Sequence, residues 1–368
     1  MNFAIIKQGG LCAGGIEKYL QHITKILIDS GHSVTYFYTD AVTCGPNNWM
    51  HPGTDATRKK YMEDLGAKLV EVSCSHIVAL EQGGEWLNTD FWDLFKEEDY
   101  DVVIGGHKGE PCWPFSQIKN TGIVETVHGT AFTSGVSKYA DAYILISEIQ
   151  NQKWFNLGGI ANKTHNIYPA VGIPEFKKSQ RSKYGIPEDK FIYGMHQSNR
   201  QGLWSPIPLN AYKAIETDDT CFVLLGGEEA YIRQAKQIGL KNFIRVPFAS
   251  TAVGVHEVLS CLDVYAHGRS DGEVCSSAII EAMYHGLPII THKSGINNGH
   301  LYQINGCGFL GDNIEQYANN MYSLFNNKQL YDESTEKTKQ AYSKKFSFVE
   351  IEKRILDVLE HVGKTNKG

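Results

Sequence analysis

Short apolar runs alternate with amphipathic segments along most of the chain, and glycine-rich loops separate them. Residues 2–6 form the first apolar run, and from Ile16 to Leu27 the apolar residues recur on one face of a helix. Short apolar runs predict buried strands, whereas a spacing of three or four residues predicts an amphipathic helix. Strands that alternate with helices are typical of parallel sheets covered by helices, so the pattern predicts an α/β protein.

The clearest unit of this kind lies within residues 264–292. An apolar run at 264–267 is followed by a polar loop, by a helical segment at 276–285, and by a second apolar run at 289–290. A serine at the start of the helical segment is a favourable N-cap, and Gly286 ends the helix. The sequence therefore predicts a strand, a loop, a helix and a second strand in the same parallel sheet.

Two glutamates occupy unusual places in this unit. Glu273 precedes the helix, and Glu281 lies inside it between apolar neighbours, where a carboxylate needs a partner. The helix start offers unpaired N–H groups and the positive end of the helix dipole to a phosphate. The arrangement fits a nucleotide-sugar site in which Glu281 accepts hydrogen bonds from sugar hydroxyls. The alternative is a surface loop with Glu281 exposed on the helix.

The segment GEVCSSAIIEAMYHGLPIIT resembles the E-x7-E signature of glycosyltransferase family 4, a family of retaining, nucleotide-sugar-dependent enzymes with the GT-B fold. Glu273 and Glu281 fall on its two glutamates, and A-M-x-x-G-x-P follows as in the family. Residues 14–20 (GGIEKYL) resemble the family's G-G-x-E loop. Residues 165–176 (HNIYPAVGIPEF) resemble its interdomain crossing.

The resemblance implies two doubly wound, Rossmann-like parallel-sheet domains that face each other across a cleft. Residues 1–168 would form the acceptor-side domain and residues 169–345 the donor-binding domain, a size that allows each its own core. Residues 346–363 form an amphipathic segment with Ser347 and Glu350 as a capping box, and resemble the family's C-terminal helix that returns to the first domain. Residues 41–98 carry no clear pattern, and acceptor-specific insertions are expected there.

The resemblance also implies roles for single residues. Glu281 would bind the ribose, and Glu273 would hold the donor sugar and stabilise positive charge without acting as a nucleophile. His128 follows an apolar run, as does the family's histidine near the transferred sugar; the alternative is a structural loop histidine. Gly15 would let the donor and the acceptor meet closely. The remaining expected donor-binding residues are Gly14, Val246 beside the nucleobase, and Val274, Cys275, Ser276 and Ser277 at the helix start.

The basic residues depart from the family pattern. The family usually carries G-R…K-G after the first strand of the second domain, but Arg200 is the sole basic residue between Lys190 and Lys213. Leu203 and Trp204 stand near the place of the lysine. Arg200 is a candidate ligand of the diphosphate, with a solvated loop arginine as the alternative. Arg269 is the second candidate.

Composition narrows the choice of partners and compartment. The net charge is −6, with the acidic excess in the first half, so neither nucleic acid nor an anionic membrane is expected as a partner. No run of 18 apolar residues occurs, so no transmembrane segment is expected. The eight cysteines form no C-x-x-C pair, which argues against zinc and a disulfide framework and for a cytoplasmic protein. Asp99 and Asp101 precede their strand, so no metal site is expected.

The sequence thus predicts an enzyme that transfers a sugar with retention and without a metal or cofactor. The donor would be a UDP- or GDP-linked sugar, and the acceptor a hydroxyl group of a glycan, a small molecule or a protein-linked acceptor. The alternatives are a catalytically silent GT-B binding protein and a related GT-B enzyme such as a sugar-nucleotide epimerase. A dinucleotide oxidoreductase is disfavoured because the glycines at 9–15 do not follow G-x-G-x-x-G.

Overall fold

The chain forms two compact units. Unit 1 comprises Met1–Ala170 and Ile351–Gly368, and unit 2 comprises Val171–Glu350. The structure, a computed structural model, describes residues 1–7, 9–12, 15–40, 43–44, 49–50, 53–80, 83–107, 113–130, 139–197, 202–227, 229–247, 249 and 251–365.

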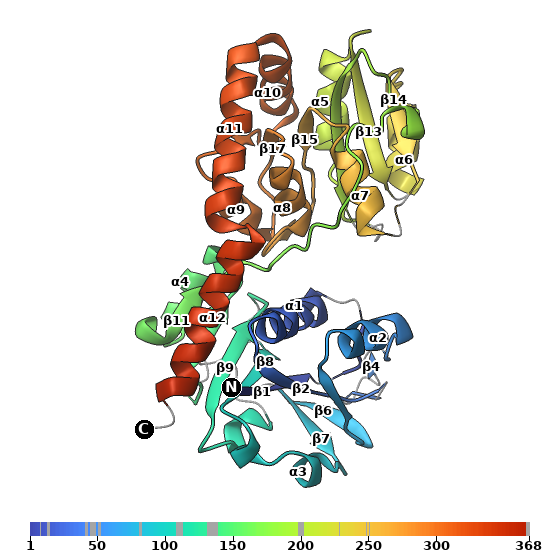
Figure 1. Ribbon diagram of the computed structural model, residues 1–368. Coiled ribbons are helices and arrows are strands. Elements are labelled where there is room, and N and C mark those ends of the chain that lie inside the picture. The colour runs from blue at the N-terminus through green and yellow to red at the C-terminus, as the bar shows by residue number, and fades with distance from the viewer. Residues whose placement is uncertain are drawn as a thin grey trace. The chain divides into compact units, whose positions relative to one another are not determined.

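Unit 1 is built on a seven-stranded sheet in which all neighbouring strands are parallel, in the order β11-β10-β9-β8-β1-β2-β5 (Figure 1). Strand β9 is buried at all of its positions, as expected for a strand inside a parallel sheet. The strands are β1 (Asn2–Lys7), β2 (Ser33–Tyr38), β5 (Lys68–Glu71), β8 (Val102–His107), β9 (Gly122–Val127), β10 (Ala142–Leu145) and β11 (Thr164–Asn166).

A smaller sheet in unit 1, with the order β4-β3-β6-β7, occupies the region where the sequence predicts no element. Its strands are β3 (Thr43–Cys44), β4 (Trp49–Met50), β6 (His76–Leu80) and β7 (Gly83–Leu87). The helices of the unit are α1 (Gly15–Asp29), α2 (Ala56–Asp64), α3 (Phe91–Leu94), α4 (Asn151–Asn156) and α12 (Phe348–Thr365), with short 3-10 turns at Glu97–Asp99, Phe115–Gln117, Glu148–Gln150 and Ala161–Lys163.

Unit 2 contains a six-stranded parallel sheet in the order β14-β13-β12-β15-β17-β19 and a two-stranded pair, β16-β18. Its strands are β12 (Phe191–Gln197), β13 (Thr220–Gly226), β14 (Phe243–Val246), β15 (Val264–Ala266), β16 (Gly272–Glu273), β17 (Ile289–Thr291), β18 (Asn297–Asn298) and β19 (Phe309–Leu310). Its helices are α5 (Ile207–Ile215), α6 (Glu229–Gln237), α7 (Ala252–Leu259), α8 (Ser277–Tyr284), α9 (Gly299–Gln303), α10 (Ile314–Asn326) and α11 (Lys328–Lys345), with a 3-10 turn at Ser182–Tyr184.

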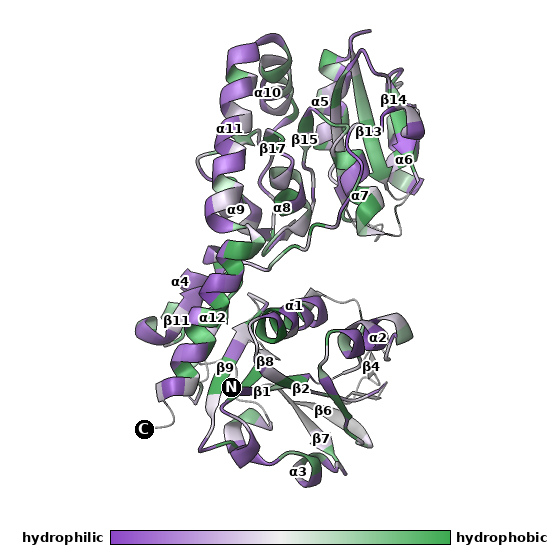
Figure 2. Ribbon diagram, in the orientation of Figure 1, coloured by the Kyte–Doolittle hydropathy of each residue, from purple (hydrophilic) through white to green (hydrophobic). Residues whose placement is uncertain are grey.

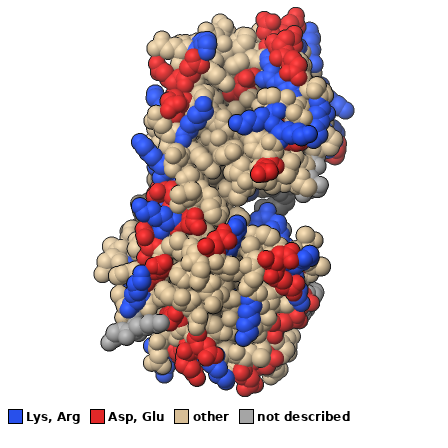
Figure 3. All heavy atoms as spheres, viewed as in Figure 1, with Lys and Arg blue, Asp and Glu red and all other residues tan. Residues whose placement is uncertain are grey.

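The prediction of two α/β parts with parallel sheets is confirmed. Figure 2 shows the strands inside each sheet largely in green, as expected where apolar side chains form the core between sheet and helices. On the face shown in Figure 3, basic and acidic side chains are interspersed over both units. In the described part of the chain, no helix combines the length and the apolar character that crossing a membrane requires.

Helix α12 completes unit 1 from the far end of the sequence. Its residues Ile351, Ile355 and Leu359 are spaced four apart and are buried. Arg354 donates a hydrogen bond to the carbonyl oxygen of Asn166 in β11, at 2.5 Å. His32 lies 3.3 Å from Glu360. The helix therefore packs its apolar face on the sheet and ties its polar flank to neighbouring segments.

We predict that Leu359→Ala lowers the free energy of unfolding of unit 1 by about 2–5 kcal/mol, because it leaves a cavity under α12. Tryptophan fluorescence during denaturant unfolding is the measurement, since Trp204 is the only one of the six tryptophans in unit 2. Val349→Ala is the control, because Val349 is 74% exposed on the same helix. Equal effects of the two substitutions would contradict the packing of α12.

Candidate functional site

The candidate site of unit 2 forms where parallel strands β12 and β15 end and helix α8 begins. β12 pairs with β15, and β15 pairs with β17, so their carboxyl ends lie at one edge of the sheet. Ligands of open α/β sheets bind at this edge. The loop after β15 leads through β16, which contains Glu273, into α8, which contains Glu281.

The start of α8 is held by Ser276 and Gln303. The Oγ of Ser276 accepts a hydrogen bond from the backbone N–H of Ile279 at 3.3 Å, so Ser276 is the N-cap, one of the two candidates, Ser276 and Ser277, that the sequence offers. The backbone N–H of Ser276 donates to Oε1 of Gln303 at 2.7 Å, and Nε2 of Gln303 donates back to the Ser276 carbonyl oxygen at 3.1 Å. The polar groups of Ser276 are thus engaged in shaping the helix start, next to Cys275 and Ser277.

Glu273 is held at both carboxylate oxygens. Its Oε2 lies 3.1 Å from Nε2 of His267, and its Oε1 accepts from Nη1 of Arg269 at 2.8 Å. Nδ1 of His267 lies 2.7 Å from Oγ1 of Thr291 in β17, which fixes the imidazole ring. Burial alone would raise the pKa of Glu273, but the hydrogen bond and charge of His267 and the charge of Arg269 lower it below its ordinary value. Glu273 is therefore an ionised, fixed carboxylate.

Arg269 lies between carboxylates. Besides Glu273, its Nε donates to Oδ1 of Asp271 at 2.7 Å, so two acidic groups balance the guanidinium. The backbone beside Arg269 pairs with residues 202–205: Ser270 N–H donates to Leu203 O at 2.8 Å, and Ser205 N–H donates to Gly268 O at 3.2 Å. Leu203 and Trp204, which stand where the family lysine was expected, are buried in this contact. The role of Arg269 toward a phosphate stays a prediction.

Glu281 has the partner that its apolar sequence neighbours demand. Nε2 of His196 lies 2.7 Å from Oε2 of Glu281. His196 is the penultimate residue of β12, one strand away from β15, after which His267 holds Glu273. Each of the two motif glutamates is thus hydrogen-bonded by a histidine at the end of a neighbouring parallel strand.

The backbone around Glu273 is packed too tightly for side chains. Gly272 has φ +63°, and a Cβ atom there would lie 1.6 Å from the carbonyl oxygen of Asn297. A Cβ at Gly299 would lie 1.9 Å from the carbonyl oxygen of Val274. Strand pair β16–β18 and the start of α9 can close around Glu273 only because both positions are glycine.

His128 follows β9 in unit 1. Oγ1 of Thr126 donates its proton to Gly105 O at 2.9 Å, and Nε2 of His128 lies 2.8 Å from Oγ1 of Thr126, which can only accept there. Nε2 must therefore carry the proton, which leaves Nδ1 as an acceptor. Burial, with a smaller contribution from the charge of Lys7, lowers the pKa of His128 to about 3. The imidazole is thus neutral at physiological pH.

The other sequence-predicted residues are placed as follows. Gly15 is the first residue of α1, and a Cβ there would meet nothing within 4 Å, so space is open beside it. Val246 ends the edge strand β14 and lines a pocket of about 400 Å³ together with Leu225 and Pro247. Gly14 and Arg200 lie outside the described residues.

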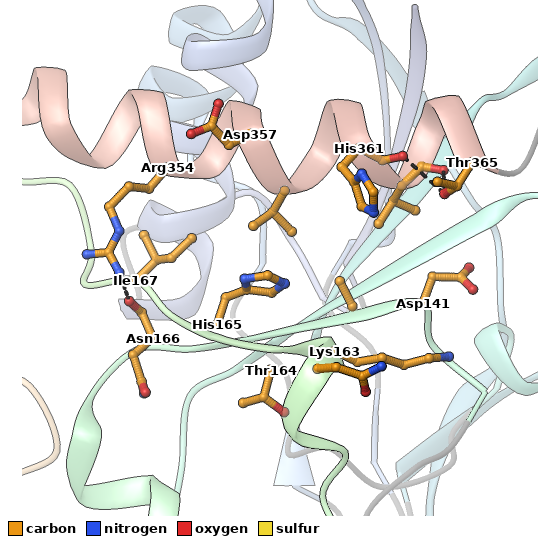
Figure 4. Close-up of a pocket in the computed structure, with 14 residues that line it drawn as sticks. Asp141, Lys163, Thr164, His165, Asn166, Ile167, Arg354, Asp357, His361 and Thr365 are labelled. Atoms are coloured by element: carbon orange, nitrogen blue, oxygen red, sulfur yellow. Dashed lines mark hydrogen bonds between the residues drawn. The ribbon is translucent and has the colours of Figure 1, made fainter.

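A further pocket, of about 820 Å³, lies in unit 1 between β11 and α12 (Figure 4). Its polar lining includes Lys163, His165, Arg354 and His361. None of the sequence-predicted site residues lines it. Among the described residues, no cluster of three or more His, Cys, Asp or Glu side chains is arranged to hold a metal ion.

The sequence does not single out His196, His267 and Gln303 as site residues. The sequence does contain a signal for His267: it is a polar residue at the end of the predicted strand 264–267, directly before the loop that leads to Glu273. The sequence indicates that Glu281 needs a partner but does not identify that partner. His196 is 85 residues away from Glu281 and reaches it only through the parallel pairing of β12 with β15. The same holds for Gln303, the last residue of α9, which meets Ser276 only after the chain has passed through β17 and β18.

We predict that His128 makes the stability of unit 1 depend on pH. The pKa in the folded state, about 3, lies below the ordinary value of 6.5, so folding favours the neutral ring. The contribution of His128 to the free energy of unfolding is fully present above pH 6.5 and is lost as the pH falls toward 3. Between pH 7 and 5, wild type should lose up to about 2 kcal/mol more unfolding free energy than His128→Gln. Equal losses would show that His128 is not held neutral.

Comparisons with known proteins bear on the family and the fold. Residues 177–341 match the family described as glycosyl transferases group 1. No curated protein sequence matches the chain significantly. Among solved structures, Anabaena HepE in complex with UDP and glucose has 18% identity and a TM-score of 0.67, with 97% of this chain and 99% of that chain covered.

Two further solved structures share the fold over nearly their whole length. The sucrose-phosphate synthase of Thermosynechococcus elongatus has 14% identity and a TM-score of 0.66, with 99% of each chain covered. A glycosyltransferase from Rickettsia africae has 13% identity and a TM-score of 0.71, with 98% of each chain covered. The match to glycosyl transferases group 1 over residues 177–341 identifies the chain as a glycosyltransferase, and its fold over nearly the whole length is that of the solved GT-B structures.

Proposed function

We propose that this glycosyltransferase takes its sugar from a UDP- or GDP-linked donor and transfers it, with retention and without a metal ion, to a hydroxyl group. The acceptor would be a glycan, a small molecule or a protein-linked group. The observation that carries the proposal is the placement of Glu273 and Glu281 around the start of α8, each oriented by a strand-end histidine. HepE, which shares the fold, was solved in complex with UDP-glucose.

In this proposal, unit 2 binds the donor. The diphosphate lies on the amides of Val274, Cys275 and Ser277 at the start of α8, where the helix dipole favours negative charge. Ser276 shapes this helix start through its bonds to Gln303 and Ile279. Glu281 accepts hydrogen bonds from the ribose hydroxyls. The nucleobase lies against the backbone after Val246, in the pocket beside Leu225 and Pro247. Arg200 adds positive charge to the diphosphate.

Glu273 acts on the donor sugar by electrostatics. The lowered pKa keeps Glu273 ionised, so it stabilises positive charge that develops at the sugar carbon. Both of its oxygens are engaged by His267 and Arg269, which makes it a poor nucleophile. Retention would then require the acceptor to attack on the face that the diphosphate leaves, with the leaving phosphate taking the acceptor's proton. This differs from retaining glycosidases, in which a second carboxylate is the nucleophile.

Unit 1 contributes His128, Gly14 and Gly15 in this proposal. The neutral His128 ring offers Nδ1 as an acceptor for a hydroxyl group of the transferred sugar, and its pKa of about 3 prevents it from acting as a general acid near neutral pH. The open space at Gly15 allows the donor and the acceptor to approach the backbone. Gly14 extends this surface.

The test is calorimetric titration with UDP, GDP and ADP in the presence of EDTA. We predict micromolar binding of UDP or GDP by wild type. Glu281→Ala should weaken it by about 10- to 100-fold, because hydrogen bonds to a charged group contribute about 1.5–3 kcal/mol. Glu315→Ala is the matched control, an exposed glutamate on α10 in the same unit.

Three results would contradict the proposal. If wild type bound neither UDP nor GDP, the proposal of a UDP- or GDP-linked donor would be wrong. Equal binding by wild type and Glu281→Ala would show that the nucleotide site lies elsewhere. Binding that depends on added Mg²⁺ or Mn²⁺ would contradict metal independence.

A further inference from the structure

His196 contacts Glu281 of the candidate donor site, and the sequence motif does not include it. Its side chain is 11% exposed, and it lies near the end of β12, on the strand next to β15. The hydroxyl group of Tyr265 in β15 donates to the backbone carbonyl oxygen of His196 at 2.7 Å and lies 3.3 Å from Nδ1 of the ring. The two rings also make an edge-to-face contact, with centroids 5.6 Å apart.

These contacts fix which nitrogen of His196 faces Glu281. With Tyr265 at Nδ1, the ring presents Nε2 to Oε2 of Glu281 at 2.7 Å, a distance typical of a charge-assisted hydrogen bond. Tyr265 is itself fully buried in the strand. A rigid strand thus holds Tyr265, Tyr265 holds His196, and His196 holds one oxygen of Glu281.

The two oxygens of Glu281 are therefore unequal. Oε2 is bonded to His196, whereas Oε1 accepts no hydrogen bond from any residue that the structure describes. The side chain is 23% exposed, so it is not sealed into the core. This contrasts with Glu273, whose two oxygens are both engaged by His267 and Arg269. Of the two motif glutamates, Glu281 is the one with an oxygen left for a ligand.

We propose that His196 is a positioning residue that sets the preference of the site for ribose. By holding Oε2, it turns Oε1 of Glu281 toward the 2′- and 3′-hydroxyl groups of the donor nucleotide. The inference rests on the proposed function, because it assigns the ribose to Glu281. Beyond that function, His196 gives Glu281 its orientation, and the ribose hydroxyl groups are the part of the ligand that is selected.

The other ionisable groups near His196 do not replace it. His256 on α7 and His285 after α8 are close enough for the charge of His196 to lower their pKa values further, although burial is the largest cause in both. Nδ1 of His256 lies 3.0 Å from Nε2 of His285, so these two rings face each other. Within the described residues, His196 alone donates to the Glu281 carboxylate.

The test compares the binding of UDP with that of 2′,3′-dideoxy-UDP by calorimetry, or the GDP pair if wild type prefers GDP. Wild type should bind the dideoxy nucleotide at least about tenfold more weakly, the equivalent of one hydrogen bond to a charged group. His196→Ala should reduce this ratio to about twofold or less. His196→Gln should keep most of it, because a glutamine amide can donate from nearly the position of Nε2.

The control is His292→Gln, a buried histidine of the same unit whose Nδ1 faces the carbonyl oxygen of Lys293 rather than a carboxylate. It should leave the ratio unchanged. A His196→Ala protein that binds both nucleotides more weakly but keeps the wild-type ratio would show a purely structural role and overturn the inference. So would loss of the ratio in folded His196→Gln. The proposed function would still stand in both cases, because it is tested separately by whether wild type binds UDP or GDP and whether Glu281→Ala weakens that binding.

Discussion

The structure of the candidate site depends on the cost of placing two carboxylates at the edge of a parallel sheet. Glu273 and Glu281 lie next to buried strands, where an unpaired charge costs several kcal/mol. Histidines at the ends of β12 and β15 offset this cost by donating hydrogen bonds to the carboxylates. The pairing fixes the glutamates before any ligand arrives, so binding a donor would not have to order them.

The backbone near Glu273 is also close-packed. Gly272 and Gly299 let β16, β18 and α9 approach within a distance that no side chain allows. Gln303, from the end of α9, then reaches the backbone of Ser276 and fixes the start of α8. The helix start, the motif glutamates and the loop before them thus form one connected polar network, in which each member limits the movement of the next.

Basic residues contribute less to the described part of the site than the family pattern leads one to expect. Arg269 is balanced by Asp271 and Glu273, and the place of the family lysine is taken by the buried pair Leu203 and Trp204. In our proposal the diphosphate therefore relies mainly on backbone amides and the dipole of α8, with Arg200 as the added charge. This predicts weaker phosphate binding than a site with two dedicated cations would give.

Much of the architecture could be predicted from the sequence because local pattern determines it. The alternation of apolar runs and helical segments predicts the two parallel sheets, and Ser276 and Ser347 mark the starts of α8 and α12. The four short strands at residues 43–87 could not be predicted, because the sequence there shows no regular spacing of apolar residues. Nor could His196 and Gln303 be placed, because their contacts join residues that are far apart in the sequence and depend on how the strands and helices pack.

The most direct test of the account is a crystal structure of the protein with bound UDP or GDP. The account predicts that Oε1 of Glu281 lies within hydrogen-bonding distance of a ribose hydroxyl while Oε2 stays on Nε2 of His196. It also predicts that the diphosphate contacts backbone N–H groups at the start of α8. A nucleotide bound elsewhere, or one whose ribose makes no contact with Glu281, would contradict the account.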